Sequence, residues 1–504
     1  MILLAVAGCA APPPALPLTP SHAAEPRPDG LLAMDVARLG MTHGPEVSGF
    51  RLLESNRDGL KWRLVLIDNA RHSLDLQYYV WFGDASGQLL MARVIAAADR
   101  GVRVRILFDD LNTMLARMTS PELRDAMLAQ IDRHPNIEIR VFNAWNERGW
   151  IGRGVEGATH FERLNRRMHN KQMIADNRAA ILGGRNVGDE YMGLNAEFNF
   201  HDLDVLGVGL VARQASAVFD RYWNSAWVRR VPLAADADAG VPTPATIELP
   251  PIAAAHPAMR ELLAGRHDWT ADLRALGDSL AAGRSAVHAD PPARDAGTHN
   301  RMPEAFRALL RSAQREVLIS NAYIIPDEIF IRDLRELSGR GVTVRLLTNS
   351  LASHDVPAVN AHYERWRGAI LDAGAALHEL RNDAAIQREL VDTAPVRSGF
   401  VGLHVKAMVV DRERSFIGSM NLDPRSEVFN AEMGVIVQSA TLGERLARAI
   451  ERDLGPANSW QVQRAEDGSL VWRSDTGQRR TQPARTVWQR LENLLFKLAP
   501  ASYY

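Results

Sequence analysis

The chain carries one polar motif twice, and this duplication limits what it can fold into more than any other feature of the sequence. The first copy lies in RRMHNKQMIADNRAAILGGRN, residues 166–186, and the second in GLHVKAMVVDRERSFIGSMN, residues 402–421. Both follow the pattern His-x-Lys-x4-Asp-x6-Gly-x2-Asn without a gap. A single His-x-Lys is common by chance in a long chain, whereas five residue types at fixed spacing, present twice, indicate an internal duplication.

The segments that precede each copy also repeat. Residues 72–110 show an apolar strand-like run, then apolar residues at helical spacing, then a β-branched run that ends in ILFDD. Residues 315–350 show the same order, from REVLISNAYIIP through IFIRDLRELSGR to RGVTVRLLTNS. Strands that alternate with helices are typical of a mainly parallel sheet with helices on both faces. The sequence therefore predicts the α/β class, with two duplicated lobes in series.

Length and composition set the expected domains. A chain of 504 residues, 46% apolar and 24% charged, is globular and too long for one core. We expect a first lobe at residues 31–233 and a second lobe at residues 301–504, which ends in an amphipathic tail. Residues 234–300 are expected to be a linker and loop region, because their first part is rich in Pro and Ala and has little periodicity.

Residues 1–30 are expected to be a signal and tether. Their apolar run ends at Cys9 and a Pro/Ala-rich stretch follows. This resembles the lipobox of bacterial lipoproteins, in which the cysteine is acylated, and it implies an envelope protein that is anchored to a membrane and faces the periplasm. The alternatives are an ordinary signal peptide or a core cysteine. No Lys or Arg precedes the run, which departs from the lipoprotein pattern.

Charge and cysteine content exclude other classes of protein. The 59 basic and 60 acidic side chains give a formal net charge of -1, so no nucleic-acid partner is expected. One cysteine excludes a disulfide framework and a cysteine-based metal cluster. After the N-terminus no segment approaches 18 uninterrupted apolar residues, and no spanning helix is expected.

The spacing of the motif predicts where its side chains point. Residues two apart in a strand face the same side, so His169 and Lys171 project together, as do His404 and Lys406. Face to face, the two copies would place imidazoles and ammonium groups around one cavity. Cations stabilise the non-bridging oxygens of a phosphodiester, and imidazole can attack phosphorus or move protons. We therefore predict phosphodiester chemistry, with no metal and no cofactor.

The aspartate and asparagine positions of the motif are expected to form turns and to donate hydrogen bonds, respectively. Asp176 and Asp411 begin the turns into the following strands, where a carboxylate accepts backbone N–H groups. Asn186 and Asn421 can donate amide hydrogens to a bound phosphate.

The sequence resembles the phospholipase D superfamily, whose signature is this duplicated motif. The segments LNRRMHNK, GGRNVGDEY, DLDVLGVG, LTNSLASHDVPAV and GSMNLDPRS resemble bacterial cardiolipin synthases, especially the C type. The resemblance implies two α/β/α sandwich lobes that share one active site at their interface. It also implies phosphatidyl transfer through a phosphohistidine, with phosphatidylglycerol and a second phospholipid forming cardiolipin. Hydrolysis to phosphatidic acid, a phosphodiesterase or nuclease, and a lipid-binding protein with an inactive site are the alternatives.

The resemblance also implies a role for each motif residue. His169 would be the nucleophile and His404 the general acid and base, although the symmetry of the motifs allows the reverse. The phosphate would be held by Lys171, Lys406, Asn186 and Asn421. The signature aspartates, Asp176 and Asp411, would be structural. An acidic residue after each copy would orient the histidine of that copy; these residues are Glu432 and Asp204, with Asp202 as the alternative to Asp204.

Two further stretches suggest contact with lipid. Arg163, Arg166 and Arg167 precede the first motif and would either grip an anionic headgroup or form a solvated surface. The C-terminal tail carries apolar residues on one helical face, namely Val487, Leu491, Leu494, Leu495 and Leu498. This stripe would either lie in a membrane surface or pack against the second lobe. Phospholipids and a membrane surface are the expected partners. The sequence does not decide whether an accessory protein also binds.

Overall fold

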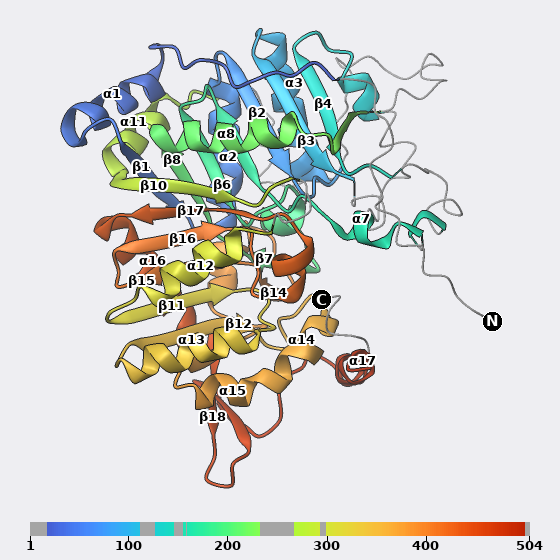
Figure 1. Cartoon of the computed structure of the whole chain (residues 1–504), viewed down its shortest axis with the longest axis vertical. Coiled ribbons are helices and arrows are strands. Elements are labelled where there is room, and N and C mark those ends of the chain that lie inside the picture. Colours follow the sequence, from blue (N-terminus) through green and yellow to red (C-terminus); the bar gives the residue numbers. More distant parts are fainter. Residues whose placement is uncertain are drawn as a thin grey trace.

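Two lobes are stacked along the longest axis of the molecule in the computed structural model (Figure 1). The structure describes residues 18–110, 127–145, 155–157, 159–231, 267–292 and 299–498. Cys9 and most of the expected linker lie outside these residues.

The first lobe is built on neighbouring strands in the order β4, β3, β2, β5, β6, β8 and β1. Their bounds are β1 (Val47–Leu53), β2 (Ser73–Tyr78), β3 (Arg103–Asp109), β4 (Ile137–Phe142), β5 (Gln172–Ala175), β6 (Ala179–Gly183) and β8 (Asp204–Val208). β9 (Val228–Arg230) pairs with β4 at the outer edge.

The second lobe repeats this order with β13, β12, β11, β15, β16, β17 and β10. Their bounds are β10 (Ala281–Ala289), β11 (Glu316–Asn321), β12 (Thr343–Asn349), β13 (Ala376–Leu380), β15 (Lys406–Val410), β16 (Arg414–Gly418) and β17 (Met433–Gln438). The outer edge continues through β18 (Ser459–Arg464), β19 (Leu470–Ser474) and β20 (Gly477–Arg479). The matching order in the two lobes is the structural form of the duplication.

The sheet is mixed, which corrects the expectation of a mainly parallel one. β2, β3 and β4 are parallel, as are β11, β12 and β13. The motif strands and the strands that follow them are antiparallel. The reason is the short connection inside each motif, residues 176–178 and 411–413, because so short a hairpin can join antiparallel strands only.

The lobes are joined through β1 and β10, which pair antiparallel with each other. Eighteen of the described strands thereby form one sheet, and β7 (Phe198–His201) and β14 (Phe400–Leu403) form a separate two-stranded sheet. β10 and α11 (Thr270–Ser279) lie inside residues 234–300, which corrects the expectation that this whole region is linker and loop. β10 belongs to the fold because it holds the position in the second lobe that β1 holds in the first.

Helices cover both faces of each lobe. In β8, Leu206 packs in one core cluster with residues of α2 and α3, whereas the adjacent Val205 packs with α8. In β11, Ile319 packs with α12 and α13, and the adjacent Leu318 packs with α16. Alternate strand residues point to opposite faces, so each lobe has α/β/α layering, as predicted. The helix bounds are α1 (Leu31–His43), α2 (Asn56–Asn69), α3 (Ala85–Asp99), α7 (Phe161–Asn165), α8 (Leu210–Trp223), α12 (Met302–Arg311), α13 (Glu328–Gly339), α14 (Pro357–Tyr363), α15 (Arg367–Asp372), α16 (Ala440–Leu454) and α17 (Val487–Phe496).

Helix starts are fixed by polar caps at several of these positions. The side chains of Ser55, Asp84 and Asp327 accept backbone N–H groups from the first turns of α2, α3 and α13. An N-cap of this kind satisfies a donor that has no partner within the helix. The caps hold the helices in register with the strands on which they pack.

The described part of the expected tether packs on the first lobe. Ser21 accepts a hydrogen bond from Trp223 Nε1 at 2.8 Å, and its carbonyl accepts one from Arg105 at 2.9 Å. Arg140 donates to the carbonyl of Thr19 at 2.8 Å. Residues 18–30 are therefore partly held by the fold, which corrects the expectation of a free tether over this stretch.

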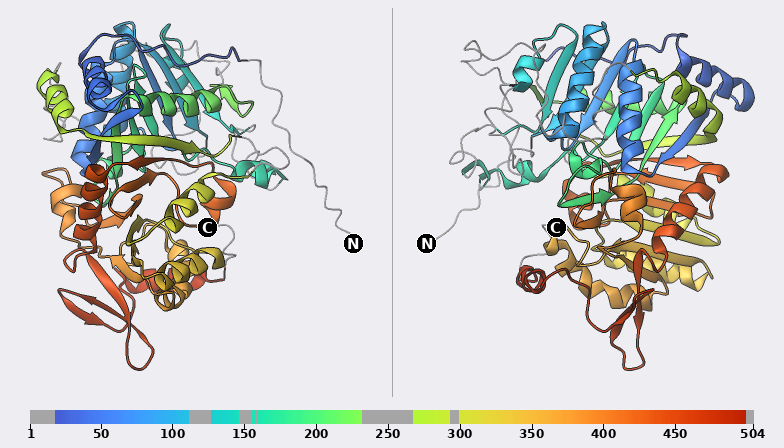
Figure 2. Two further views of the ribbon diagram at one scale, coloured as in Figure 1. Left: turned by 60° about the vertical axis from the view of Figure 1, so that its left-hand side comes forward. Right: turned by 180° about the vertical axis from the view of Figure 1, so that it is seen from behind.

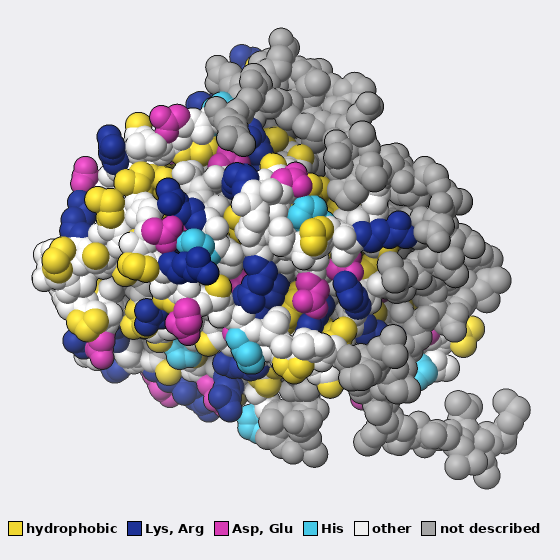
Figure 3. Space-filling model, turned by 90° about the horizontal axis from the view of Figure 1, so that it is seen from above, with side chains coloured by type: hydrophobic (Ala, Val, Ile, Leu, Met, Phe, Trp, Pro, Cys, Tyr) yellow, Lys and Arg dark blue, Asp and Glu magenta, His cyan; other side chains and the backbone are white. Residues whose placement is uncertain are grey.

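Charged side chains of both signs are interspersed on the exposed face of the first lobe (Figure 3). Apolar side chains lie singly between them in the same view. No large field of one sign is visible among the described residues in this view.

Candidate active site

A short segment leads into each motif and pairs with the backbone of the other lobe. The histidine of the motif stands at the end of this segment. Met168 forms a parallel bridge with Ala431, and the N–H of His169 donates to the carbonyl of Ala431 at 2.8 Å. In the other copy, β14 (Phe400–Leu403) pairs in parallel with β7 (Phe198–His201), and the N–H of His404 donates to the carbonyl of His201 at 2.7 Å. The residue that follows each of these partners is acidic. Backbone pairing across the lobe boundary therefore brings each histidine to a carboxylate.

The histidine–carboxylate pairs are exchanged between the lobes. His169 Nδ1 lies 2.9 and 2.8 Å from the two carboxylate oxygens of Glu432. His404 Nδ1 lies 2.6 Å from Asp202 Oδ2. This corrects the expectation that each acidic residue orients the histidine of its own copy. The strand crossing is the physical reason, because it turns each acidic residue toward the opposite motif.

Asp204 does not contact a histidine, which corrects its expected role. It is fully buried and pairs with Arg63 at 3.0 Å and with Arg185 at 3.2 Å. Its partner in β6 is Gly183, just as Gly434 partners Gly418 in the second lobe. The position of Asp204 thus corresponds to a glycine.

Asp202 and Glu432 hold equivalent positions. Each stands two residues before the strand position described above, which Asp204 fills in one lobe and Gly434 in the other. The alternation of apolar residues in DLDVL and EMGVI would have given this alignment from the sequence, because it places Asp202 opposite Glu432.

A glycine permits the close approach of the acidic segment in the first lobe. A Cβ atom at Gly184 would collide with the carboxylate of Asp202. The glycine pair at the end of the first motif therefore leaves room for the carboxylate that holds His404.

Burial disfavours the charged form of both motif imidazoles. It lowers the pKa of His169 to about 4, although Glu432 favours the charged form. It also lowers the pKa of His404, against the opposing effect of Asp202. A neutral imidazole that donates Nδ1–H to a carboxylate keeps the Nε2 lone pair for chemistry. The side chains retain small exposed fractions, 9% and 7%, so the rings are close to the surface of the site.

The two lysines lie directly beside the histidines. Lys171 Nζ donates to the carbonyl of His169 and Lys406 Nζ to that of His404, each at 2.6 Å. Burial lowers the pKa of Lys171 well below its usual value and that of Lys406 to about 8. An ammonium group has three N–H donors, so each lysine that is charged can still donate to a bound anion.

Charges of the two copies act on each other. Lys406 contributes to lowering the pKa of His169, and Lys171 contributes to lowering that of His404. The positively charged form of one copy therefore disfavours the charged form of the other. The motifs form one electrostatic unit at the lobe boundary, as the sequence predicts.

Asp176 and Asp411 lie in the hairpin turns of their motifs, at φ 54° each. Asp176 accepts backbone N–H groups from Arg71, His72 and Ser73 at 2.7–3.1 Å. Asp411 accepts the equivalent set from residues 314–316 at 2.7–3.2 Å. Both carboxylates therefore hold the strand before the motif against the motif turn, in keeping with a structural role.

The two motif asparagines differ in their contacts. Asn186 accepts from the N–H of Val80 at 3.2 Å and donates to the Tyr191 hydroxyl at 3.0 Å. Asn421 keeps its Oδ1 buried without a hydrogen-bond partner, while its backbone N–H donates to Ser426. Asn186 is therefore bound within the first lobe, and Asn421 has unused hydrogen-bonding capacity.

A tyrosine stands over each lysine, and the second one has an additional partner. The ammonium groups of Lys171 and Lys406 lie 5.1 and 5.6 Å from the ring centres of Tyr79 and Tyr323. The Tyr323 hydroxyl donates to Asp355 at 2.7 Å. Asp355 is the carboxylate that sequence reasoning missed, because its loop is distant from both motifs in the sequence.

The arginines before the first motif are buried, which overturns both expectations for them. Arg163 pairs with Glu156, and Arg167 pairs with Asp109 at 3.2 Å. Arg166 donates to the carbonyl of Pro292 at 2.9 Å. These cations hold the entry to the motif within the protein.

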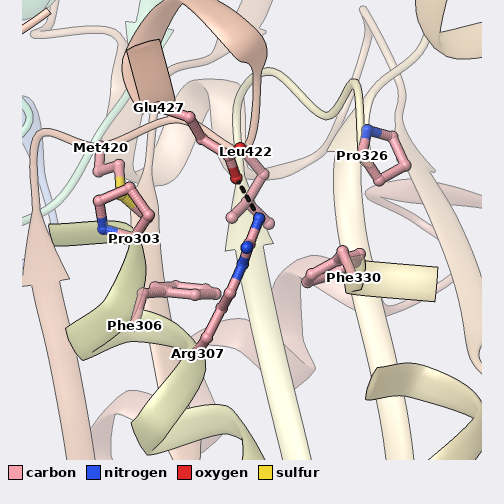
Figure 4. Close-up of a pocket in the computed structure, with 8 residues that line it drawn as sticks. All are labelled: Pro303, Phe306, Arg307, Pro326, Phe330, Met420, Leu422 and Glu427. Atoms are coloured by element: carbon pink, nitrogen blue, oxygen red, sulfur yellow. Dashed lines mark hydrogen bonds and ion pairs between the residues drawn. The ribbon is translucent and has the colours of Figure 1, made fainter. Parts of the chain in front are cut away.

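A pocket lies behind the second motif (Figure 4). Met420 and Leu422, on either side of Asn421, line it, and Arg307 reaches across it to Glu427 at 2.8 Å. No motif histidine or lysine lines this pocket. The pocket is therefore separate from the motif histidines and lysines, and the second motif meets it only through the neighbours of Asn421.

Within the described residues, no group of three or more histidine, cysteine, aspartate or glutamate side chains could hold a metal ion. In the same residues, no helix is both long and apolar enough to cross a bilayer.

A family model described as "Cardiolipin synthase, PLD-like domain" matches residues 64–223 and 306–454, one segment in each lobe. The chain belongs to the cardiolipin synthase family. Cardiolipin synthase C of Escherichia coli (strain K12) is 34% identical over 483 residues, which are 94% of this chain and 99% of that protein. The major cardiolipin synthase of Bacillus subtilis (strain 168) is 25% identical over 80% of this chain and 68% of that protein.

The fold of this cardiolipin synthase family member also has a solved counterpart. The crystal structure of phosphatidylserine synthase from Haemophilus influenzae covers 83% of this chain and 90% of its own. The TM-score is 0.56 at 13% sequence identity, so the two share the fold.

Proposed function

We propose that the protein transfers a phosphatidyl group from one phospholipid to the hydroxyl of phosphatidylglycerol and so forms cardiolipin. The observation that carries this proposal is the exchanged pair of contacts, His169 with Glu432 and His404 with Asp202. Two imidazoles that are oriented alike and flanked by two lysines supply a nucleophile, a proton carrier and cations for one phosphodiester.

In the first step, His169 Nε2 attacks the phosphorus of the donor phospholipid. The bond from phosphorus to the headgroup oxygen breaks, and protonated His404 gives its proton to the departing alkoxide. Lys171 and Lys406 stabilise the charge on the non-bridging oxygens. The product is a phosphatidyl group bound to His169, and a free headgroup alcohol leaves.

In the second step, the hydroxyl of phosphatidylglycerol attacks the same phosphorus. Neutral His404 takes the hydroxyl proton, the bond from phosphorus to His169 breaks, and cardiolipin is released. His404 ends protonated and His169 neutral, so both groups return to their starting forms.

The assignment of the two histidines is supported by Asp355. The charge of His404 contributes to lowering the pKa of Asp355, and the interaction is reciprocal, so Asp355 favours a protonated His404. Burial lowers the pKa of His404 overall, and the nearby Asp355 opposes this effect. A histidine with this additional carboxylate nearby suits the acid role. A neutral His169, whose pKa burial lowers to about 4, suits the nucleophile role.

Hydrolysis is the main alternative, with water in place of phosphatidylglycerol in the second step. The same residues would perform it, and phosphatidic acid would be the product. A nuclease is disfavoured by the formal net charge of -1, because nucleic-acid binding draws on a basic excess.

The deciding experiment is mass spectrometry of the lipids made from vesicles of phosphatidylethanolamine and deuterated phosphatidylglycerol. We expect cardiolipin that carries the label, and no product from the His169→Asn variant. Phosphatidic acid as the main product, at the same rate with or without phosphatidylglycerol, would establish hydrolysis instead.

The proposal includes attachment to the cell envelope through an acylated Cys9, with the site facing the periplasm. The lipobox-like segment supports it. Cys9→Ser should move the protein from the membrane fraction or leave its precursor uncleaved. Unchanged fractionation together with an unmodified N-terminal mass would refute the anchor.

A further inference from the structure

The C-terminal helix α17 is packed with its polar side inward. Gln489 and Asn493 are buried, with exposed fractions of 4% and 2%. Gln489 donates to the carbonyl of Leu351 at 2.5 Å, and Asn493 accepts from the amide of Asn360 at 2.7 Å. Lys497, one turn further on, forms an ion pair with Glu364 of the same lobe. The helix is therefore held to the body by hydrogen bonds and charge.

The apolar side of α17 and of the residue positions just after it faces outward. Trp488 is 63% exposed, Val487 83% and Leu498 85%. Leu491, Leu494 and Leu495 on the same face are also exposed, at 43%, 58% and 56%. Nearly half of the large hydrophobic side chains that are exposed in the described part of the chain lie between Val487 and Leu498. This excludes packing against the second lobe as the reason for the apolar stripe.

A surface helix normally buries its apolar stripe and exposes its polar one. A concentrated, exposed apolar face on a soluble domain marks a surface that another apolar phase covers. The reversed arrangement of α17 is stable here because every buried polar side chain named above has a partner.

The helix is fastened to a loop that belongs to the active site. Arg485, just before α17, donates to the carbonyl of His354 at 3.3 Å. The ring of His354 stacks on that of Tyr323 at 5.2 Å, and the adjacent Asp355 binds the Tyr323 hydroxyl. The loop that contains His354 and Asp355 thus connects α17 with the phosphate site. If α17 rests on another surface, this loop fixes the distance between that surface and the site.

The location of α17 agrees with this link. In Figure 1 the helix stands out from the second lobe on the same side as α7, which leads into the first motif. The view from behind in Figure 2 shows α17 outside the body of the lobe. The exposed Phe161, at 46%, lies on α7.

We propose that α17 is a membrane-docking helix that rests its apolar face on a phospholipid bilayer and presents the active site to lipids at its surface. The occupant follows from the chemistry, because the proposed donor and acceptor both reside in a bilayer, and the inference rests on that proposed function. The exposed Arg490 adds a cation for anionic headgroups. A helix of this kind lies in the plane of the interface, with its apolar residues below the headgroups.

The test compares two variants of the full chain, both carrying Cys9→Ser so that an acyl anchor cannot hide the effect. The first combines Trp488→Gln, Leu494→Gln and Leu495→Gln. The matched control combines Met34→Gln and Met41→Gln on α1, which are 67% and 83% exposed on the other lobe. All five positions are exposed, so the fold is expected to be kept, and circular dichroism checks it.

The first measurement is flotation with vesicles of phosphatidylethanolamine and phosphatidylglycerol. We expect the α17 variant to lose at least 10-fold in binding and the α1 variant to bind like the parent. Equal binding of all three proteins, or no binding of the parent, would overturn the proposal. A parent that is dimeric in solution, with an α17 variant that is monomeric, would assign the face to a second copy of the chain and would overturn it too.

The second measurement separates docking from chemistry. Turnover of a short-chain, water-soluble phosphatidylglycerol should be equal in parent and α17 variant, while turnover of vesicle lipid should fall with binding. If the proposed function failed, neither substrate would react in any variant, yet the flotation result would still stand. Equal loss on both substrates would show that α17 acts on the site and not on docking.

Discussion

The two motif copies have the same backbone plan but different electrostatic surroundings. Each places a histidine against a carboxylate of the opposite lobe and a lysine against the carbonyl of that histidine. The second copy adds Asp355, bound to the tyrosine that stands over Lys406. In the described residues, the tyrosine of the first copy, Tyr79, has no such carboxylate in hydrogen-bond contact. One duplicated frame can therefore host two different proton roles.

The largest expected effect comes from removing either histidine. His169→Asn and His404→Asn should each lower turnover by at least about 100-fold, the scale for loss of a general acid or base. A donor phospholipid whose leaving group needs no acid would distinguish the roles of the two histidines. With it, His404→Asn should accumulate a phosphatidyl adduct, which intact-protein mass spectrometry detects and peptide mapping places on His169.

Two results would break this comparison. An adduct on His404 in the His169→Asn variant would reverse the two roles. Half of the parent activity in each single variant would mean two independent sites.

The next effect is expected from the exchanged carboxylates. Glu432→Gln and Asp202→Asn keep the shape but remove the charge that holds Nδ1–H, and each should cost roughly 10- to 100-fold or more. With a donor whose leaving group needs no acid, Glu432→Gln should slow formation of the adduct on His169, and Asp202→Asn should slow only its turnover. Rapid-quench kinetics separates the two steps. The matched control is Asp204→Asn, which should act mainly on the melting temperature because Asp204 pairs with Arg63 and Arg185.

A smaller effect is expected in the pH dependence of kcat/KM. The nucleophile must be neutral, and the pKa of His169 is lowered to about 4, so this group keeps its activity down to about pH 4 and loses it below. His404 must be protonated for the first step, and burial lowers its pKa below the ordinary histidine value, so this contribution falls first as the pH rises. Lys406 must be charged, and its pKa is lowered to about 8, so its contribution falls as the pH rises through 8. Glu432→Gln should move the acidic limb to lower pH, because the carboxylate favours the protonated imidazole. An acidic limb that stayed near the ordinary histidine value of about 6.5 in both proteins would contradict the assignment.

A still smaller difference should separate the two tyrosines. Tyr323→Phe removes the hydroxyl that binds Asp355, and we expect roughly a 10-fold loss in kcat on the scale of a positioning contact. Tyr79→Phe should change kcat by less than about 3-fold, because its ring remains over Lys171. If the two substitutions had equal effects on kcat, the contact of Asp355 with Tyr323 could not be the reason why the two histidines have different roles.

No effect is expected from chelation, since neither role in the comparison is assigned to a metal. Activity should be unchanged after dialysis against EDTA. Loss of turnover that one divalent ion restored would contradict the mechanism for both copies.

Much of the fold followed from the sequence, because the repeated motif and the repeated strand–helix–strand order are local patterns. The same holds for the motif turns, in which Asp176 and Asp411 accept N–H groups from the preceding strand. The pairing of Asp202 with His404 could not be derived in this way. It depends on strands that cross from one lobe to the other, and no periodicity within one segment records that crossing.

Other misses have comparable causes. β10 has weak alternation and follows a Pro-rich stretch, so its sequence suggests a loop, and its place is set by pairing with β1. The role of Asp355 depends on a loop that approaches Tyr323 only in the folded protein. The sequence predicted the apolar stripe of α17. Whether the stripe faces the protein or the solvent depends on Gln489 and Asn493, which form hydrogen bonds with the second lobe.

The exchange of carboxylates implies a history for the chain. Two copies of a single-lobe ancestor, related by a two-fold axis, would give every contact across the boundary twice, with each copy completing the other. Joining the copies end to end preserved that reciprocity and ended the requirement that they be identical. Each half could then mutate alone, and the two now carry different acids at this position, a glutamate in one and an aspartate in the other. A lobe expressed alone would lack the carboxylate for its own histidine, and the two lobes expressed as separate chains would regain it on assembly.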